Sequence, residues 1–267
     1  MPEPPVVVIL LAGQRAGAIN PLAARARVSH KCLVPIRGKP LLIHVLDTVT
    51  ALPAVSEIRI SVEAEAHDEL RPLLADYAGG PPIRLVASRP KLIESVVAAA
   101  GDDEGPFLVT TADNVLVTPA AAAQIRREMT EADGVFALAR KDDVLAAHPE
   151  AQRGFYRFRD GEFANCNIYG LANRKTFPVA ADVFAGGGQF MKSARRMIDA
   201  FGLHNIVLLR LGVFGVKAAM RRLSRRTGIE IRATIFTDGS LAVDVDNERT
   251  YRVCEELLVR REGRATD

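Results

Sequence analysis

Cysteine is scarce in this chain of 267 residues, and tryptophan is absent. The three cysteines, Cys32, Cys166 and Cys254, are odd in number and widely spaced, so the sequence predicts neither a disulfide framework nor a zinc site. This cysteine content favours a reducing, cytoplasmic setting. The chain also lacks any stretch of about 18 uncharged apolar residues, so we expect no membrane-spanning helix, and its start lacks the basic region of a signal peptide.

The chain also lacks a large excess of either charge, because 35 basic and 32 acidic residues leave a net charge of +3. The charge is nevertheless unevenly distributed. Residues 1–40 contain six basic residues and one acidic residue. Residues 205–232 contain seven basic residues and one acidic residue. Such patches suit phosphates, nucleic acid or an anionic membrane, although solvated helix faces also explain them. With no Trp and only four Tyr for base stacking, nucleic acid is the least favoured partner.

Predicted strands and helices alternate over the first 140 residues. The six consecutive aliphatic residues Val6–Leu11 are typical of a buried strand in a parallel sheet. This alternation predicts an α/β fold, namely a Rossmann-like, three-layer α/β/α arrangement around a mostly parallel sheet. Further strands are predicted over 58–62, 83–86, 107–110 and 135–138, and helices over 40–51, 67–77, 92–100 and 119–130.

The alternation is lost after residue 140. Strands over 155–158 and 162–164 flank the turn Asp160-Gly161, which predicts an added β-hairpin section. Because we find no linker and no internal repeat, we expect residues 1–267 to form a single domain. Later strands are predicted over 168–171, 229–236 and 241–243, and later helices over 192–201, 205–226 and 248–259.

Two segments near the start combine basic residues with glycine. The loop Leu11–Gly17 places glycines and Arg15 at the carboxyl end of the first strand, where ligands bind in open α/β sheets and freed N–H groups cradle phosphates. The simpler alternative is a turn without a ligand. Lys31 comes next, before an apolar stretch and the helix start Gly38-Lys39-Pro40. It either places a positive charge near a triphosphate or belongs to a surface turn.

Acidic residues follow two later strands. Asp113 comes shortly after the strand 107–110 and is expected at the same edge of the sheet as the first loop. Asp244 and Asp246 precede the last helix, so one of them can complete a metal site with Asp113 while the other caps the helix. Oxygen ligands of this kind suit a hard cation that is bound together with substrate phosphates.

Together these segments resemble the nucleotidyltransferase superfamily with a glycosyltransferase-A-like α/β fold. The greatest similarity is to NTP transferases like the molybdenum-cofactor guanylyltransferases, and to the cytidylyltransferases of sugar and polyol phosphates. The order and approximate spacing agree over nearly the whole chain. The resemblance is carried by Leu11-Ala12-Gly13, Arg15, Lys31, Gly38-Lys39-Pro40-Leu41-Leu42, Asp113, Asn167-Ile168-Tyr169-Gly170 and Asp244-Val245-Asp246.

The resemblance implies a role for each matching segment. The first loop would wrap the triphosphate, with Arg15 and Lys31 as catalytic cations. Mg²⁺ would be the cofactor, held by Asp113 and by Asp246 or, less favoured, Asp244. The residues implied in nucleotide binding are Leu11, Ala12, Gly13 and Gln14, with Ser95 near the base pocket.

The acceptor is expected over the hairpin section, with Asn165, Asn167 and Lys192 as candidate ligands. The two asparagines alternate along a predicted strand and therefore share one face. Residues 1–140 would then form the NTP-binding half, and residues 141–267 the half that binds the acceptor and completes the metal site.

The chain departs from the family pattern in its first loop. Gly13-Gln14 stands where the family has a pair of glycines, and residues 18–29 lengthen the connection to Lys31. Arg25 or Arg27 is therefore an alternative to Arg15. The glycine-poor loop also leaves open a nucleotide-binding relative without turnover. A dinucleotide-binding Rossmann fold is disfavoured because G-x-G-x-x-G is absent.

The implied reaction is transfer of NMP from an NTP, with CTP favoured, to a sugar, polyol or alcohol phosphate, with release of pyrophosphate. Guanylyl transfer to a cofactor phosphate is the alternative. The expected partners are the NTP and the phosphorylated acceptor, and no nucleic acid. Residues 208–226 are expected to form a core helix with a solvated basic face, and contact with an anionic membrane surface is the second interpretation of this segment.

Overall fold

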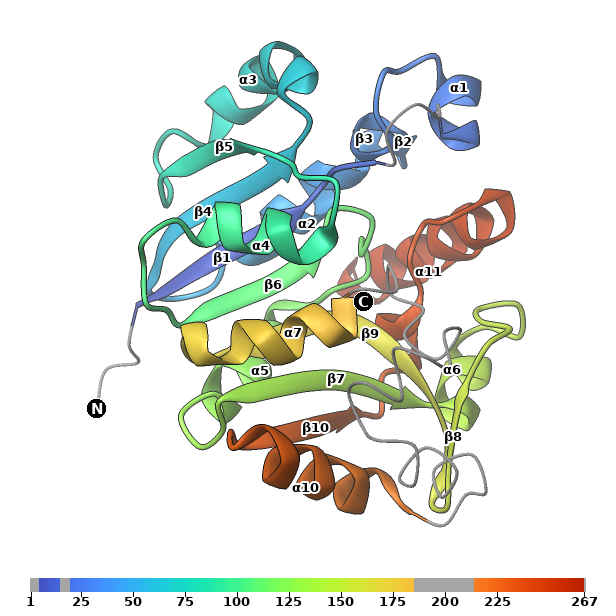
Figure 1. Cartoon of the computed structure of the whole chain (residues 1–267). Helices are drawn as coiled ribbons and strands as arrows, with labels where there is room; N and C mark the ends of the chain where they lie inside the picture. The colour runs from blue at the N-terminus through green and yellow to red at the C-terminus, as the bar shows by residue number, and fades with distance from the viewer. Residues whose placement is uncertain (1–4, 15–19, 185–213, 267) are drawn as a thin grey trace.

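The computed structural model describes residues 5–14, 20–184 and 214–266 (Figure 1). In this part of the chain one sheet of eight strands crosses the molecule. The strands are β1 (Val6–Leu11), β4 (Val55–Val62), β5 (Ile83–Ala87), β6 (Phe107–Thr111), β7 (Gly134–Arg140), β8 (Tyr156–Phe158), β9 (Gly161–Leu171) and β10 (Ile231–Phe236). Their order is β10-β7-β9-β6-β1-β4-β5, and β8 pairs with β9 beside this path.

Most of the sheet is parallel. The strands β5, β4, β1 and β6 are parallel neighbours, and β10 is parallel to β7. Only β9 reverses direction, because it is antiparallel to β6, β7 and β8. The predicted α/β fold with a mostly parallel sheet is therefore confirmed, and the predicted hairpin section is the pair β8–β9.

Helices cover both faces of this sheet (Figure 1). On one face lie α4 (Leu92–Ala100), α7 (Phe177–Phe184) and α10 (Val216–Thr227). On the other lie α2 (Leu41–Thr50), α3 (His67–Leu74), α5 (Pro119–Glu128), α6 (Lys141–Ala147) and α11 (Glu248–Thr266). The short helix α1 (Pro21–Ala26) and the two-stranded hairpin β2 (Pro35–Ile36) and β3 (Lys39–Pro40) lie beyond the end of β1.

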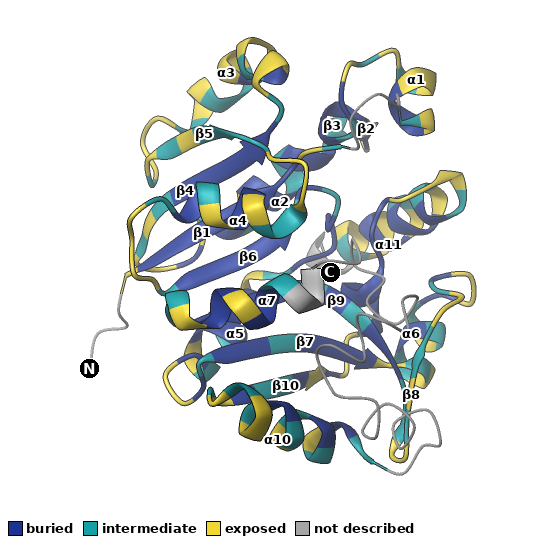
Figure 2. Cartoon of the chain, viewed as in Figure 1, coloured by how far each residue is buried: buried dark blue, intermediate teal, exposed yellow. Residues whose placement is uncertain are grey.

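Alternation along the first strand explains the two-sided core. In β1, Val6, Val8 and Leu10 pack with the helices of one face, and Val7, Ile9 and Leu11 with those of the other. Because successive side chains of a strand point to opposite faces, both faces of a buried strand must be apolar. Figure 2 shows the result: the central strands β1 and β6 are buried, the edge strand β5 is only half-buried, and helices such as α4 and α10 expose their outer sides.

Short 3-10 helices shape several connections. They are η1 (Lys31–Leu33), η2 (Ala64–Ala66), η3 (Ala75–Tyr77), η4 (Arg174–Thr176) and η6 (Gly239–Ala242). The last of these corrects the strand predicted over 241–243. The Asp238 side chain accepts the Ser240 N–H (3.0 Å), which closes a tight turn there instead of an extended segment.

The strand β9 corrects a second prediction. Separate strands were predicted over 162–164 and 168–171, but β9 is continuous from Gly161 to Leu171. The polar residues between the two segments resemble a break in sequence, yet they stay within the sheet because β9 pairs with β6 on one side and β7 on the other.

Other predictions need little adjustment. The helices α1 and α6 were not predicted, and the last helix extends beyond residue 259 to Thr266. The helix predicted over 192–201 lies outside the described residues, as does the start of the one predicted over 205–226. Among the helices that the structure describes, none is both long and apolar enough to cross a membrane.

Candidate active site

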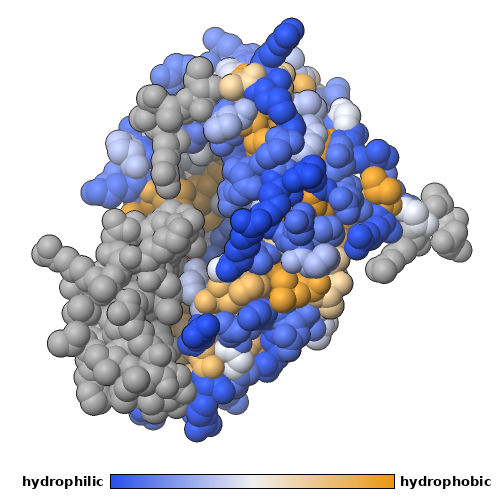
Figure 3. All heavy atoms as spheres, turned by 90° about the vertical axis from the view of Figure 1, so that its right-hand side faces the viewer, coloured by the Kyte–Doolittle hydropathy of each residue, from blue (hydrophilic) through white to orange (hydrophobic). Residues whose placement is uncertain are grey.

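The candidate site lies at the edge of the sheet where β1, β4 and β6 end. Leu11, the last residue of β1, pairs with Ser61 on one side and Thr111 on the other. Just beyond, the Ala12 N–H donates to Ser61 O (2.8 Å), and the Ala112 N–H donates to Leu11 O (3.0 Å). The loops that follow therefore leave the sheet side by side, at the edge where open α/β sheets bind ligands. Figure 3 looks onto this side of the molecule, which is largely hydrophilic where it is described.

A glutamate after β4 holds the loop that follows β1. The Gln14 N–H donates to Glu63 Oε1 (2.9 Å), and Ser88 Oγ donates to the same oxygen (3.1 Å). Gly13 lies against both partners, since a Cβ there would be 3.0 Å from Glu63 Oε1 and 3.2 Å from Ser88 Cβ. Arg15 lies outside the described residues. Glu63 had no predicted role here, and the signal for it is its place directly after a strand of this edge.

Lys31 lies between two of the predicted metal ligands. Its ammonium group hydrogen-bonds Asp113 Oδ2 and lies 3.0 Å from Asp246 Oδ1. Lys31 begins η1, where the next residues, Cys32 and Leu33, are buried and anchor the turn. Burial alone would lower the pKa of Lys31, but the two carboxylates raise it above its ordinary value. Lys31 is thus a fixed positive charge.

Asp244 and Asp246 reach the site on the segment between η6 and α11. The Val245 N–H donates to Asp113 O (3.1 Å), which ties this segment to the turn after β6. Neither aspartate caps the helix, which corrects one of the predicted roles. The cap is Asn247, whose Oδ1 accepts two backbone N–H groups of the first turn (3.1 and 3.2 Å). Both carboxylates therefore remain available to the site.

The two aspartates differ in exposure. The Asp246 side chain is 63% exposed, whereas Asp244 is only 5% exposed. Asp244 Oδ2 accepts a hydrogen bond from Asn167 Nδ2, while Oδ1 is buried without a hydrogen-bond partner in the described part of the chain. Burial raises the pKa of Asp244 well above its usual range, and the charges of Asp113 and Asp246 raise it further. The cluster therefore holds more carboxylates than cations.

This donor set fits Mg²⁺, which prefers oxygen ligands and is commonly bound by one or two carboxylates together with substrate phosphates. A divalent cation would offset the charge that raises the pKa of Asp244 and could give its buried Oδ1 a partner. Among the described residues, no three His, Cys, Asp or Glu side chains converge as a complete metal site. The coordination would therefore need substrate oxygens.

Three polar side chains on β9 continue the site toward the predicted acceptor side. Asn165 Nδ2 donates to Asn167 Oδ1 (2.7 Å) and to the Tyr169 hydroxyl, which itself donates to Asn167 Oδ1 (3.0 Å). Asn167 has a φ of 50°, a left-handed conformation that asparagine tolerates, and the register with β7 shifts at this point. Because Asn167 also donates to Asp244, this chain of hydrogen bonds reaches the carboxylate cluster.

Sequence reasoning assigned no role to Tyr169, although its alternation with Asn165 and Asn167 places it on the same face of the strand. Lys192, the third predicted acceptor ligand, lies outside the described residues. Tyr169 is buried, and its contact with both asparagines fixes how their amide groups are oriented.

Ser95 and Arg25 have partners outside the carboxylate cluster, and Arg27 is exposed. The Ser95 hydroxyl accepts the Arg89 N–H (2.8 Å) and donates to Arg89 O (3.2 Å), so it shapes the loop between β5 and α4. Arg25 forms an ion pair with Glu248 and lies 4.5 Å from the centre of the Tyr251 ring, which holds α1 against α11. Arg27 is exposed at the end of α1.

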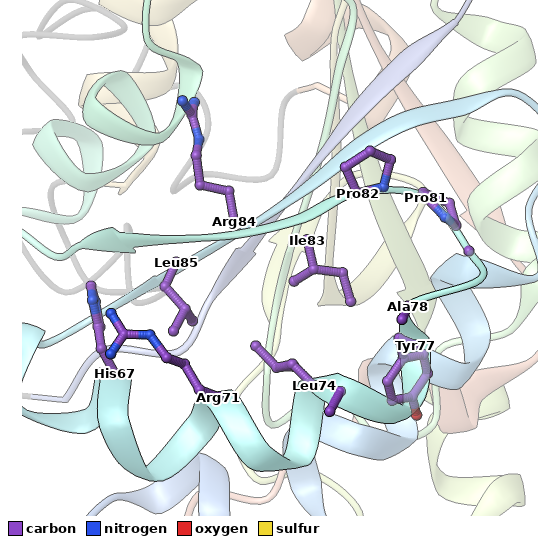
Figure 4. A pocket seen from close by; sticks show the side chains of 12 residues that line it. His67, Arg71, Leu74, Tyr77, Ala78, Pro81, Pro82, Ile83, Arg84 and Leu85 are labelled. Carbon is purple, nitrogen blue, oxygen red and sulfur yellow. The ribbon is translucent and has the colours of Figure 1, made fainter.

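A pocket of about 620 Å³ lies elsewhere, between α3 and the edge strand β5 (Figure 4). Leu74 from the helix and Ile83 and Leu85 from the strand line it, with His67 and Arg71 at one end. No predicted site residue lines this pocket, so it is separate from the candidate active site.

The described chain is thus a mostly parallel α/β sheet that gathers a lysine and aspartates at the carboxyl edge of its strands, where open α/β sheets bind their ligands. Residues 7–202 match the family model described as the MobA-like NTP transferase domain. The chain belongs to this family and is therefore a nucleotidyltransferase.

Three solved structures have a similar fold. A hypothetical transferase from Thermus thermophilus is 28% identical with a TM-score of 0.73, and the match covers 92% of this chain and 99% of that one. A 4-diphosphocytidyl-2C-methyl-D-erythritol synthase from Anaerococcus prevotii has the same fold at 11% identity and a TM-score of 0.58, covering 96% of each chain. A CMP:2-keto-3-deoxy-manno-octonic acid synthetase in complex with CTP matches at 14% identity with a TM-score of 0.56. The match covers 96% of this chain and 99% of that one. No curated protein sequence is significantly similar.

Proposed function

We propose that this protein is a Mg²⁺-dependent enzyme that transfers CMP from CTP to a sugar, polyol or alcohol phosphate and releases pyrophosphate. The observation that carries the proposal is the contact of the Lys31 ammonium with Asp113 and Asp246 at the carboxyl edge of the sheet. Phosphoryl transfer needs positioning and charge stabilisation more than covalent chemistry, and this cluster supplies both a cation and oxygen ligands. The choice of CTP is supported by the cytidyl products named for two proteins of the same fold.

The first loop and Lys31 would hold the triphosphate. Of the described N–H groups in the loop, those of Ala12 and Gln14 already donate to Ser61 and Glu63. The N–H of Gly13 makes no hydrogen bond within the described residues and remains for a phosphate oxygen. Lys31, together with Arg15, would stabilise the charge that develops on the leaving pyrophosphate.

The carboxylates would position the reacting phosphates. Mg²⁺ held by Asp113 and Asp246, with Asp244 behind them, would neutralise charge on the transferred phosphate when bound. No general base is needed, because an acceptor phosphate is already ionised near neutral pH. The hydrogen bond from Asn167 keeps Asp244 oriented toward this cluster.

The acceptor would lie over β9, where Asn165 and Asn167 share one face, with Lys192 as a third ligand. In this proposal residues 1–140 would bind the NTP, with Ser95 near the base pocket, and residues 141–267 would bind the acceptor and complete the metal site. The three cysteines are free and buried, which supports a cytoplasmic setting for the reaction.

Pyrophosphate release from each of the four NTPs tests this proposal. The assay combines Mg²⁺ with sugar, polyol and amino-alcohol phosphates, and compares the native protein with Asp113→Asn. We expect release that needs CTP, one acceptor and Mg²⁺. Asp113→Asn should reduce the rate of pyrophosphate release by at least about 100-fold, because it removes a charged group that would help to stabilise the transition state. Asp68→Asn is the matched control, since within the described residues this exposed aspartate pairs only with Arg71 on α3.

The other outcomes distinguish the alternatives. Release that requires GTP and a cofactor phosphate would replace the proposal by guanylyl transfer. NTP binding without release for any acceptor would indicate a nucleotide-binding relative without turnover. Equal activity of Asp113→Asn and the native protein would remove the carboxylate cluster from the mechanism.

A further inference from the structure

The helix α10 concentrates positive charge that the proposed reaction does not use. It has no acidic residue, and its first N–H group is capped by a side chain from the β8–β9 turn. The Val216 N–H donates to Asp160 Oδ1 (3.0 Å) and Oδ2 (3.1 Å). At its other end Gly228 adopts a left-handed conformation and closes the helix. The cations of the helix are Lys217, Arg221, Arg222, Arg225 and Arg226.

The apolar side of α10 is already occupied by the protein. Val216, Ala219 and Leu223 are buried, and they pack on the sheet face formed by β7 and β10. The helix therefore cannot insert an apolar side into a lipid bilayer without leaving the sheet. Any partner of this helix must contact its basic side.

The basic side of α10 presents a straight stripe of cations. Lys217, Arg221 and Arg225 are exposed and four residues apart, so they lie along one side of the helix over about 12 Å. Within the described residues, none of these three has an ion-pair or hydrogen-bond partner.

Two other cations near the stripe, Arg232 and Arg222, have partners within the described residues, so the stripe is a local feature. Arg232 on the adjacent β10 pairs with Glu131 (2.7 Å) and Glu230 (3.6 Å). Arg222 lies 3.6 Å from the centre of the Phe214 ring and is half-buried. The charge of the stripe, by contrast, is not offset by any carboxylate that the structure describes.

We propose that the stripe Lys217, Arg221 and Arg225 is an electrostatic docking surface for an anionic phospholipid membrane. A helix that lies along the surface with Lys217, Arg221 and Arg225 exposed along one side matches a flat layer of phosphates. Single-stranded nucleic acid is less suited, because no aromatic side chain is exposed in the described chain to stack on bases. Duplex DNA is less suited because α10 is packed against the sheet and does not protrude as a groove-entering helix does. The inference does not depend on the proposed function.

Flotation with phospholipid vesicles tests the docking surface. The full chain is mixed with phosphatidylcholine vesicles or with vesicles that also contain phosphatidylglycerol, at low and high ionic strength. We expect binding to the anionic vesicles alone, and loss of binding as salt screens the charges. Each cation near an anionic surface contributes about a fivefold gain in partitioning, so Lys217→Gln, Arg221→Gln and Arg225→Gln together should weaken binding by about 100-fold.

A second triple variant separates the stripe from net charge. Arg71→Gln, Lys91→Gln and Arg260→Gln remove the same number of exposed cations from other elements, and they should leave vesicle binding within about twofold of the native protein. Thermal unfolding of both triple variants checks that each is folded. Pyrophosphate release from soluble substrates should be unchanged in the stripe variant.

Three results would overturn the proposal. They are absence of native binding to anionic vesicles, equal binding to both kinds of vesicle, and an equal loss in both triple variants. Tighter binding to a random DNA duplex than to vesicles, lost in the stripe variant alone, would reassign the surface to nucleic acid.

Discussion

At Gly13 the backbone passes so close to its neighbours that a side chain has little room. A Cβ would lie 3.0 Å from Glu63 Oε1, and Glu63 is the residue that also accepts the Gln14 N–H. The tight contact thus keeps the Gly13 N–H in a defined direction next to a carboxylate that is itself held by Ser88. A loop with one glycine, where the family has a pair of glycines, can thus still present an N–H donor to a phosphate.

Gly13→Ala should therefore impair the reaction more than the fold. The added methyl group must displace Glu63 or the loop by a few tenths of an ångström, which misplaces the phosphate donor. We expect kcat/KM for pyrophosphate release to fall by about tenfold, with most of the change in KM for the NTP. Steady-state kinetics measure this effect. Gly154→Ala is the control, because no atom of the described residues lies within 4 Å of a Cβ there. Equal effects of both changes would contradict this role of Gly13.

The start of α10 is capped by a residue that is far away in sequence. Asp160, in the turn between β8 and β9, caps α10 across 56 positions, and the Arg159 N–H donates to Phe214 O (2.9 Å) just before that helix. A helix without such a cap leaves N–H groups of its first turn without partners. The cap also fixes where the basic side of α10 begins.

Asp160→Ala should destabilise the protein by about 1 kcal/mol, the usual cost of losing a helix cap. Asp160→Asn keeps a side-chain acceptor and should retain most of the stability. Urea unfolding followed by circular dichroism provides the measurement. If the alanine and asparagine variants unfold at the same urea concentration as the native protein, the contact does not stabilise α10.

The strand β9 stays extended because of the two strands that pair with it. In sequence the polar stretch around Asn165 and Asn167 resembles an interruption between two short strands. Pairing with both β6 and β7 keeps this stretch extended, and the shift in register against β7 accommodates Asn167. The same pairing turns two asparagines and Tyr169 toward one side, where they reach Asp244.

In the whole molecule, the candidate site joins the two ends of the chain. Lys31 contacts Asp246 across 215 positions, and Arg25 joins α1 to the start of α11. A ligand that bridges these segments would bind the folded state only, so it should stabilise the entire fold by mass action.

Mg²⁺ and CTP together should therefore raise the melting temperature. A ligand at about 100 times its Kd adds about 2.7 kcal/mol, which corresponds to about 5 to 10 °C for a chain of this size. Thermal unfolding with CTP alone, with Mg²⁺ alone, with both, and after EDTA addition measures the effect. Asp113→Asn should abolish the joint effect and Asp68→Asn should not. An equal shift with CTP after EDTA addition would argue against a metal in this site.

The sequence by itself determined the α/β fold and most of its elements, because the apolar pattern of each segment reports which of its faces is buried. It also predicted Asp113 at the carboxyl edge of the sheet, because this residue follows a buried strand. Lys31, Asp244 and Asp246 were predicted as site residues from their spacing and from the family resemblance. Only the tertiary structure decided that Lys31 lies between two aspartates, that Asn247 caps the last helix, and that Glu63 and Tyr169 support the site. These facts depend on distances between segments up to 215 positions apart, and no local pattern of residues encodes such distances.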